Sequence, residues 1–234
     1  MMYQGSKRML AKELIPIILK DRVGGQYYVE PFVGGANLIQ FVDGNCIGGD
    51  SNKYVIAHLN KIKEDTSWVY ESAKDFKREN YYEIRDNLDN YEPYLIGHVA
   101  YNLSFGGKWF GGWQSNKRGD DLVAAGYIHV LRQSEKIKHI HFTCCEYSEL
   151  PLPCNSIIYC DPPYKGTEKY KNIQFDYDLF YQWCIQKRSE GHQIFISEYE
   201  MPSYFKCIWE KQVRMGMDCK TNGLRRVERL FTLK

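Results

Sequence analysis

Short β-rich runs alternate with longer segments of helical spacing along much of the chain. Apolar and β-branched residues bounded by turn residues indicate buried strands. Five such runs cover residues 27–32, 46–50, 139–144, 156–160 and 192–197. Two further strand-like runs, 207–213 and 227–233, are joined by a stretch that contains Gly and Asn, and this arrangement predicts a closing β-hairpin.

Apolar residues recur with a spacing close to 3.6 over 52–63 and 121–137, which predicts helices there. Helices are also expected over 6–20, 93–104 and 178–190. Alternation of strands and helices is typical of an α/β sheet.

Strand signals are absent from residue 64 to residue 138, a stretch too long for one crossover between neighbouring strands. Its first part is dense in charge and is interpreted as a solvated helical face. We therefore expect a main domain made of 1–63 and 139–234, and an inserted subdomain made of 64–138.

Composition and charge limit the classes of partner. The 234 residues are 44% hydrophobic and 26% charged, which is typical of a globular protein, and the net charge is only +2. A nucleic-acid partner would therefore be bound by a local basic patch. The longest aliphatic run, 14–19, is too short to cross a membrane, and the charged N-terminus does not resemble a signal peptide. We expect a cytoplasmic protein with no membrane partner.

Cysteines and histidines do not predict a metal site. The eight cysteines contain no CxxC pair, and we expect reduced and mostly buried thiols. The six histidines show no spacing typical of metal ligands, so we expect no metal.

Three short motifs place an acid at the end of a predicted strand. They are VEPFVGGAN at 29–37, GGDSN at 48–52 and SIIYCDPPY at 156–164. Ligands of open α/β sheets bind at the carboxyl ends of strands. The first two motifs also suit simple turns and helix capping, and GxGxxG, the dinucleotide fingerprint, is missing.

The third motif carries more specific chemistry. Its two prolines restrict the backbone and hold Asp161 in a fixed position. A carboxylate and a proline carbonyl can both accept hydrogen bonds from an exocyclic amino group, and Tyr164 offers a flat face on which a base can stack.

These motifs, together with YQGSK at 3–7, resemble the motif set of Dam-like, D12-class DNA adenine N6-methyltransferases, and phage-type DNA adenine methylases in particular. The resemblance implies a Rossmann-like sheet that binds S-adenosylmethionine, with 64–138 as an inserted helical target-recognition subdomain. The family more often has Trp and a Gly-Gly pair where this chain has Tyr3 and Gly5-Ser6.

The resemblance also implies roles for individual residues. The residues implied to bind S-adenosylmethionine are Tyr3, Lys7, Glu30, Pro31, Phe32, Gly34, Gly35, Asp50 and Asp161. Methyl transfer is expected at Asp161, Pro162, Pro163 and Tyr164, without a metal.

Basic residues interleaved with aromatic ones suggest where double-stranded DNA binds. Residues 103–118 contain three basic residues, no acidic residue and several rings between glycine pairs. The same rings also suit a small aromatic core for the subdomain. Including the C-terminal hairpin, the candidates are Lys108, Trp109, Trp113, Lys117, Arg118, Lys220, Arg225 and Arg226.

The sequence thus predicts site-specific methylation of the N6 amine of a flipped-out adenine. The alternatives are N4-cytosine methylation, an idle DNA-binding protein with the same fold, and methylation of RNA or a protein amide. Asp161, where N4-cytosine enzymes more often have Ser, favours adenine. The recognition sequence, a paired restriction enzyme and the oligomeric state stay open, and a monomer is compatible with the sequence.

Overall fold

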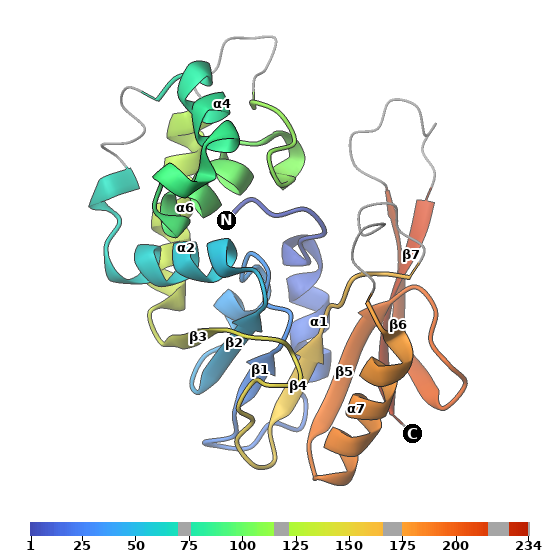
Figure 1. Ribbon diagram of the computed structural model, residues 1–234. Helices are drawn as coiled ribbons and strands as arrows, with labels where there is room; N and C mark the ends of the chain where they lie inside the picture. The colour runs from blue at the N-terminus through green and yellow to red at the C-terminus, as the bar shows by residue number, and fades with distance from the viewer. Residues whose placement is uncertain (70–75, 115–121, 166–174, 215–224, 234) are drawn as a thin grey trace.

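The computed structural model describes residues 1–69, 76–114, 122–165, 175–214 and 225–233. Its strands form one seven-stranded sheet in the order β3-β2-β1-β4-β5-β7-β6 (Figure 1). The strands are β1 Tyr28–Glu30, β2 Cys46–Asp50, β3 Ile140–Cys144, β4 Ile157–Cys160, β5 Gln193–Glu198, β6 Phe205–Arg214 and β7 Arg225–Leu233. All seven strands expected from the sequence are present.

Strand direction divides the sheet into two parts. The five strands β3, β2, β1, β4 and β5 pair in parallel. The long strand β7 pairs antiparallel with β5 on one side and with β6 on the other, which confirms the expected C-terminal hairpin. Chain order reverses between β1 and β4, and in open α/β sheets the crevice at such a switch point is where ligands bind.

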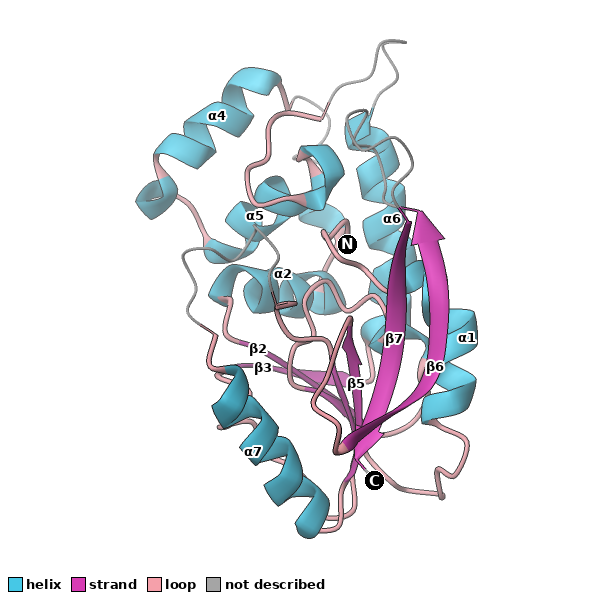
Figure 2. Cartoon of the chain, turned by 90° about the vertical axis from the view of Figure 1, so that its right-hand side faces the viewer, coloured by secondary structure: helices cyan, strands magenta, loops and turns pink. Residues whose placement is uncertain are grey.

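Helices cover both faces of this sheet. The longer helices are α1 Ala11–Ile18, α2 Lys53–Glu64, α4 Arg78–Asp86, α5 Pro93–Gly97, α6 Leu122–Ile137 and α7 Tyr177–Ser189. Helix α7 and helix α1 lie on opposite sides of the strands (Figure 2). The single helix expected over 93–104 is divided, because α5 passes into a π-helical turn at His98–Asn102.

Successive strand residues face opposite sides of a sheet, and this alternation produces two cores. Tyr28 and Tyr159 belong to the core under α1, α2 and α6, whereas Val29 and Ile158 belong to the core under α7. The strands β1, β4 and β5 are therefore buried on both faces, as their continuous apolar runs predicted. The expectation of a buried strand over 139–144 was wrong for one face, because β3 is an edge strand whose residues alternate between buried and exposed.

A third, smaller core lies within the segment expected to be inserted. It contains buried Tyr81, Ile84, Ile96, Val99 and Leu103. Helix α6 behaves differently, because its Val130 and Ile137 pack in the core beside the sheet. The helical region around α4 and α5 lies at the end of the molecule opposite to the C-terminal end of α7 (Figure 1).

The seven cysteines in the described part of the chain are all free thiols. The expectation that most are buried was wrong, since only Cys46, Cys160 and Cys184 are buried while Cys144, Cys154 and Cys207 are exposed. The exposed thiols lie at the end of β3, in the loop before β4 and on the edge strand β6. Among the described helices, none is long and apolar enough to cross a bilayer.

Candidate active site at the carboxyl ends of the parallel strands

Three carboxylates meet at one edge of the sheet. Glu30 is the last residue of β1, Asp50 is the last residue of β2, and Asp161 directly follows β4. These strands are neighbours and run in parallel, so their carboxyl ends lie at the same edge. The sequence motifs around the three acids therefore converge on the switch point of the sheet.

Asp50 links two of these motifs. Its Oδ2 accepts a hydrogen bond from the Gly34 backbone N–H at 2.9 Å, and its Oδ1 accepts one from the Asn52 N–H at 2.9 Å. The N-terminus of α2 is capped by Asn52 and not by Asp50. Helix capping therefore does not explain why residue 50 is an aspartate. Its hydrogen bond to Gly34 instead fixes the glycine turn after β1 against the end of β2.

The glycine turn is shaped to receive the N-terminal aromatic residue. Gly34 has φ +45°, and a Cβ added to it would lie 2.7 Å from Cε1 of Tyr3. A Cβ on Gly35 would come equally close to the Tyr3 side chain, at 2.7 Å from its Cβ. The Tyr3 ring also packs against Tyr101, with centroids 5.0 Å apart. The two motifs are thus packed together, and the glycines are required by this packing.

Phe32 extends the site toward the opposite face of the sheet. Its ring stacks on Tyr147 with a centroid distance of 5.2 Å and contacts Phe175 and Phe180 edge-on. Pro31, just before it, is buried. These contacts anchor the turn after β1 in the core under α7.

A buried ion pair joins the N-terminal motif to the end of β4. The Lys7 Nζ lies 2.9 Å from Oδ1 of Asp161 and 3.8 Å from Oε2 of Glu228. Lys7 is only 8% exposed. Burial by itself lowers the pKa of Lys7, but the two carboxylates outweigh it, so the pKa lies above the usual lysine value. Lys7 is therefore a charged ammonium at neutral pH.

Asp161 is held by charge more than by hydrogen bonds. Burial raises its pKa, and the Lys7 ammonium lowers it again in part. The Oδ1 atom is buried and is paired with the Lys7 ammonium at 2.9 Å. Because a carboxylate oxygen can accept more than one hydrogen bond, a ligand amine can bind Asp161 beside Lys7.

The residues that follow Asp161 are fixed by side chains from two other elements. The Pro163 carbonyl accepts a hydrogen bond from the Tyr177 hydroxyl at 2.9 Å. The Tyr164 hydroxyl donates to Oε2 of Glu228 at 3.0 Å, and its ring packs edge-on against Tyr199 at 4.6 Å. The Lys7 Nζ lies 4.6 Å from the centroid of the same ring. Tyr164 is consequently buried, at 8% exposure.

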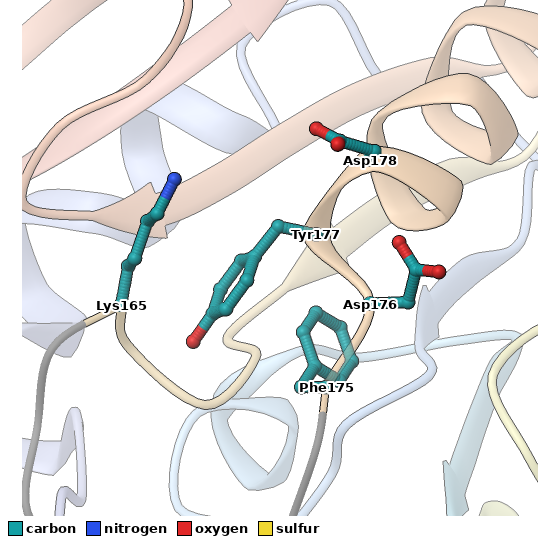
Figure 3. A pocket seen from close by; sticks show the side chains of 5 residues that line it. All are labelled: Lys165, Phe175, Asp176, Tyr177 and Asp178. Carbon is teal, nitrogen blue, oxygen red and sulfur yellow. The ribbon is translucent and has the colours of Figure 1, made fainter.

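A hollow of about 440 Å³ lies beside this turn, lined by Lys165, Phe175, Asp176, Tyr177 and Asp178. The side chains of Lys165 and Tyr177 face one another across it (Figure 3). None of the residues singled out from the sequence lines this hollow. Tyr177, which lines the hollow, also donates a hydrogen bond to the Pro163 carbonyl, so the hollow lies next to the turn after Asp161.

Two acids of the site were missed in the sequence. Glu198 ends β5 and accepts hydrogen bonds from the backbone N–H groups of Tyr199 at 2.7 Å and Lys165 at 3.2 Å. Burial raises its pKa to about 7. The expected strand 192–197 stopped one residue before this acid, so the same strand-end signal could have identified it. Glu228 gave no local signal, since only the pairing of β7 brings it to the site.

Glu30 is almost completely enclosed, at 3% exposure, and its Oε1 accepts a hydrogen bond from the Tyr28 hydroxyl at 2.8 Å. Burial raises its pKa to about 8. Glu30 is therefore mostly protonated at neutral pH and adds little negative charge to the site.

We predict that Glu30→Gln increases the free energy of unfolding relative to wild type, and increasingly so as the pH rises toward about 8. Between the usual glutamate pKa and the raised one, the folded wild type binds a proton that the unfolded chain has lost, so its stability falls with rising pH. Glutamine cannot titrate and keeps an acceptor for Tyr28. Denaturant unfolding at several pH values measures the difference, and a difference that does not change with pH would contradict the prediction.

The DNA-binding candidates fall in different environments. Lys108 and Trp109 are exposed, and the Trp109 ring packs against Tyr54 at 5.1 Å. Trp113 lies in the small aromatic core, 5.7 Å from Tyr81 between centroids. The Arg226 guanidinium donates to the Tyr199 hydroxyl at 3.0 Å. Lys117, Arg118, Lys220 and the side chain of Arg225 lie outside the described residues.

The strand order, with five parallel strands and a switch point between β1 and β4, is consistent with a Rossmann-like methyltransferase fold. Residues 3–105 match the D12 class N6 adenine-specific DNA methyltransferase family. The chain is 26% identical over 218 residues to the Retron Ec67 DNA adenine methylase of Escherichia coli, covering 83% of this chain and 75% of that protein. It is 27% identical over 195 residues to the Type II methyltransferase M.FokI of Planomicrobium okeanokoites, covering 70% of this chain and 28% of that protein.

These similarities confirm the prediction of an adenine-specific DNA methyltransferase of the D12 class. The family implies a DNA substrate and a methyl donor of the S-adenosylmethionine type. The described residues contain no group of His, Cys, Asp and Glu able to hold a metal ion.

Proposed function

We propose that the protein transfers a methyl group from S-adenosylmethionine to the N6 amine of an adenine flipped out of double-stranded DNA. The observation that carries this proposal is the position of Asp161, a buried carboxylate that is paired with the Lys7 ammonium and precedes two prolines at the carboxyl end of β4. A carboxylate held in this way beside a proline carbonyl suits an exocyclic amine as ligand.

The residues at the switch point fit the methyl donor. Asp50 is half-buried and ends the strand next to β1, so a ribose hydroxyl can reach its carboxylate. Tyr3, Lys7 and the turn from Glu30 to Gly35 lie together at the carboxyl ends of β1 and β4. When bound, the donor supplies a methyl group already activated by the sulfonium. The protein has to bring an amine into line with it.

Asp161 and the Pro162 carbonyl would accept hydrogen bonds from the two N6 hydrogens of the adenine. This geometry directs the nitrogen lone pair toward the methyl group and stabilises the positive charge that develops on the amine. Lys7 supports the ionised form of Asp161, because the ammonium lowers the pKa of that carboxyl. Pro163, held by Tyr177, keeps the backbone of the turn in place.

The target adenine must leave the duplex, at a cost of a few kcal/mol in stacking and pairing. Tyr164 is the proposed stacking surface. The ring is only 8% exposed and packs against Tyr199, so stacking of a base on it requires a local rearrangement. The chain thereby couples base capture to a rearrangement around Tyr164.

We assign target recognition to the inserted segment 64–138 and catalysis to 1–63 with 139–234. The small core around Tyr81 and Val99 gives the inserted segment packing of its own. Exposed Lys108 and Trp109 lie on the loop beside the N-terminal motif, since the Gln4 N–H donates to the Gly107 carbonyl at 2.9 Å. DNA bound at this loop would lie close to the methyl-transfer site.

The direct test is transfer of labelled methyl from S-adenosylmethionine to unmethylated DNA, followed by nucleoside analysis of the product. Label in N6-methyladenine supports the proposal. Label in N4-methylcytosine would overturn the choice of base, and transfer only to RNA or protein would overturn the choice of substrate.

We predict that Lys108→Gln weakens DNA binding and lowers the slope of log affinity against log salt by about one unit, because one phosphate contact is lost. Binding should be measured over a range of salt concentrations. Lys138→Gln is the matched control. Lys138 is exposed but precedes β3, so it lies at the amino ends of the parallel strands and not at the carboxyl ends, where the candidate site is. Equal slopes for the two variants would place the DNA surface elsewhere.

A further inference from the structure

Glu228 reaches the methyl-transfer site from the C-terminal hairpin. Its Oε2 accepts the hydrogen bond of the Tyr164 hydroxyl at 3.0 Å and lies 3.8 Å from the Lys7 ammonium. The side chain is only 14% exposed. One carboxylate thus contacts both the ring proposed to stack on the base and the cation paired with Asp161.

The register of β7 aims Glu228 at this site. Leu230, two residues further along the strand, is fully buried in the core beside α1, so Glu228 points to the same face. Its cross-strand partner on β6 is Lys211, but that ammonium forms an ion pair with Glu13 of α1. The cation nearest to Glu228 in the described part of the chain is therefore Lys7.

We infer that Glu228 is a positioning residue for methyl transfer, which orients the Tyr164 ring through its hydroxyl and shares the Lys7 ammonium with Asp161. This inference rests on the proposed function. It extends the active site from the strand-end motifs to the hairpin that closes the sheet. It also gives the hairpin a role in catalysis in addition to its packing.

The charges around Asp161 set the expected pH dependence. The groups that act on or near it come from the N-terminal motif, from β1, from β4 and the turn after it, from β5 and from β7, namely Lys7, Glu30, Tyr159, Tyr164, Glu198 and Glu228. Glu228 raises the pKa of Asp161, against the lowering by Lys7. Removing the Glu228 charge therefore moves the acidic limb of the kcat/KM profile to lower pH, which loss of packing alone would not do.

Two substitutions separate the hydrogen bond from the charge. Glu228→Leu removes both and is expected to lower kcat by roughly 10- to 100-fold, with KM for S-adenosylmethionine unchanged, because the reacting groups are misplaced. Glu228→Gln keeps an acceptor for the Tyr164 hydroxyl and is expected to recover part of kcat, while the acidic limb stays shifted. Glu210→Leu, an exposed glutamate of β6 in the same hairpin, is the matched control and should behave as wild type.

A double-mutant cycle tests the route through Tyr164. If Glu228 acts through the Tyr164 hydroxyl, Tyr164→Phe combined with Glu228→Leu lowers kcat no further than the more damaging single substitution. Fully additive effects would overturn this route. If Glu228→Leu does not fold, as judged by thermal unfolding, the Gln variant and Tyr164→Phe carry the test.

The outcomes distinguish this inference from the proposed function. A wild type that forms no N6-methyladenine contradicts both. An active wild type with Glu228→Leu and Glu228→Gln matching Glu210→Leu in kcat and pH profile overturns the role of Glu228 alone. Reduced kcat, partial recovery with Gln and a shifted acidic limb support it.

Discussion

Asp161→Asn is expected to lower the rate of methyl transfer by at least about 10³-fold. Asparagine has the same shape, but it lacks the negative charge that stabilises the developing cation, and its amide N–H₂ would face the incoming amine as a donor. The fold should persist, because the buried Lys7 ammonium still has Glu228 at 3.8 Å. The measurement is single-turnover transfer of labelled methyl to DNA at saturating enzyme.

Asp43→Asn provides the matched control, since Asp43 is an exposed residue of the loop before β2. It should retain wild-type activity. Asp161→Asn should remain folded at the assay temperature, as judged by thermal unfolding, and should bind DNA like wild type, so that the loss is assigned to chemistry. Wild-type rates in the Asp161→Asn enzyme would mean that the reaction takes place at another strand end.

Lys7→Met is expected to have the second largest effect, because it acts on both stability and activity. Methionine fills most of the lysine volume but leaves the carboxylates of Asp161 and Glu228 without their shared cation. Removing one partner of a buried ion pair commonly costs about 3–5 kcal/mol of unfolding free energy. Lys7 has a raised pKa, so its stabilising contribution is fully present at neutral pH.

The pH dependence of the Lys7→Met enzyme follows from the same charges. Lys7 lowers the pKa of Asp161, so without it that pKa rises further above the usual aspartate value. Residual activity should therefore lose its acidic side, with the limb moved to higher pH. The stability loss should shrink at low pH, where protonation of the carboxylates removes their repulsion.

Lys12→Met on α1, where the side chain is exposed, controls for loss of a nearby positive charge. Denaturant unfolding and kcat/KM profiles should be compared for the two variants and wild type. If Lys7→Met and Lys12→Met have equal stability and the same acidic limb, the buried pair does not support the ionised Asp161.

The local sequence was sufficient for the strands and for the acids at the ends of β1, β2 and β4. Runs such as SIIYC are continuous and apolar because both faces of a parallel sheet are covered. This pattern can be recognised in a single short segment of the sequence. Glu30, Asp50 and Asp161 end neighbouring strands, and carboxyl ends of parallel strands meet at one edge. Their convergence could therefore be predicted without knowing any side-chain contact.

The segment expected to be inserted, 64–138, was less predictable. Its charge-dense beginning indicated a helical face, and α4 at Arg78–Asp86 is present. The basic and aromatic loop left two interpretations open, and the structure places Trp113 in the small core while Trp109 is exposed. Spacing along a glycine-rich loop does not decide which ring is covered, because that depends on Tyr81 and Phe76 from a distant part of the chain.

By itself, the sequence determined the individual strands, the acids at the strand ends and the rigid turn at Asp161, since each of these depends on residues close together in the chain. Only the tertiary structure decided that Tyr3 fills the space above Gly34, that Lys7 pairs with Asp161, and that Glu228 closes the site. These contacts join segments far apart in the sequence. Their geometry is set by strand register and core packing, and a shift of β7 by one residue would turn Glu228 to the opposite face of the sheet.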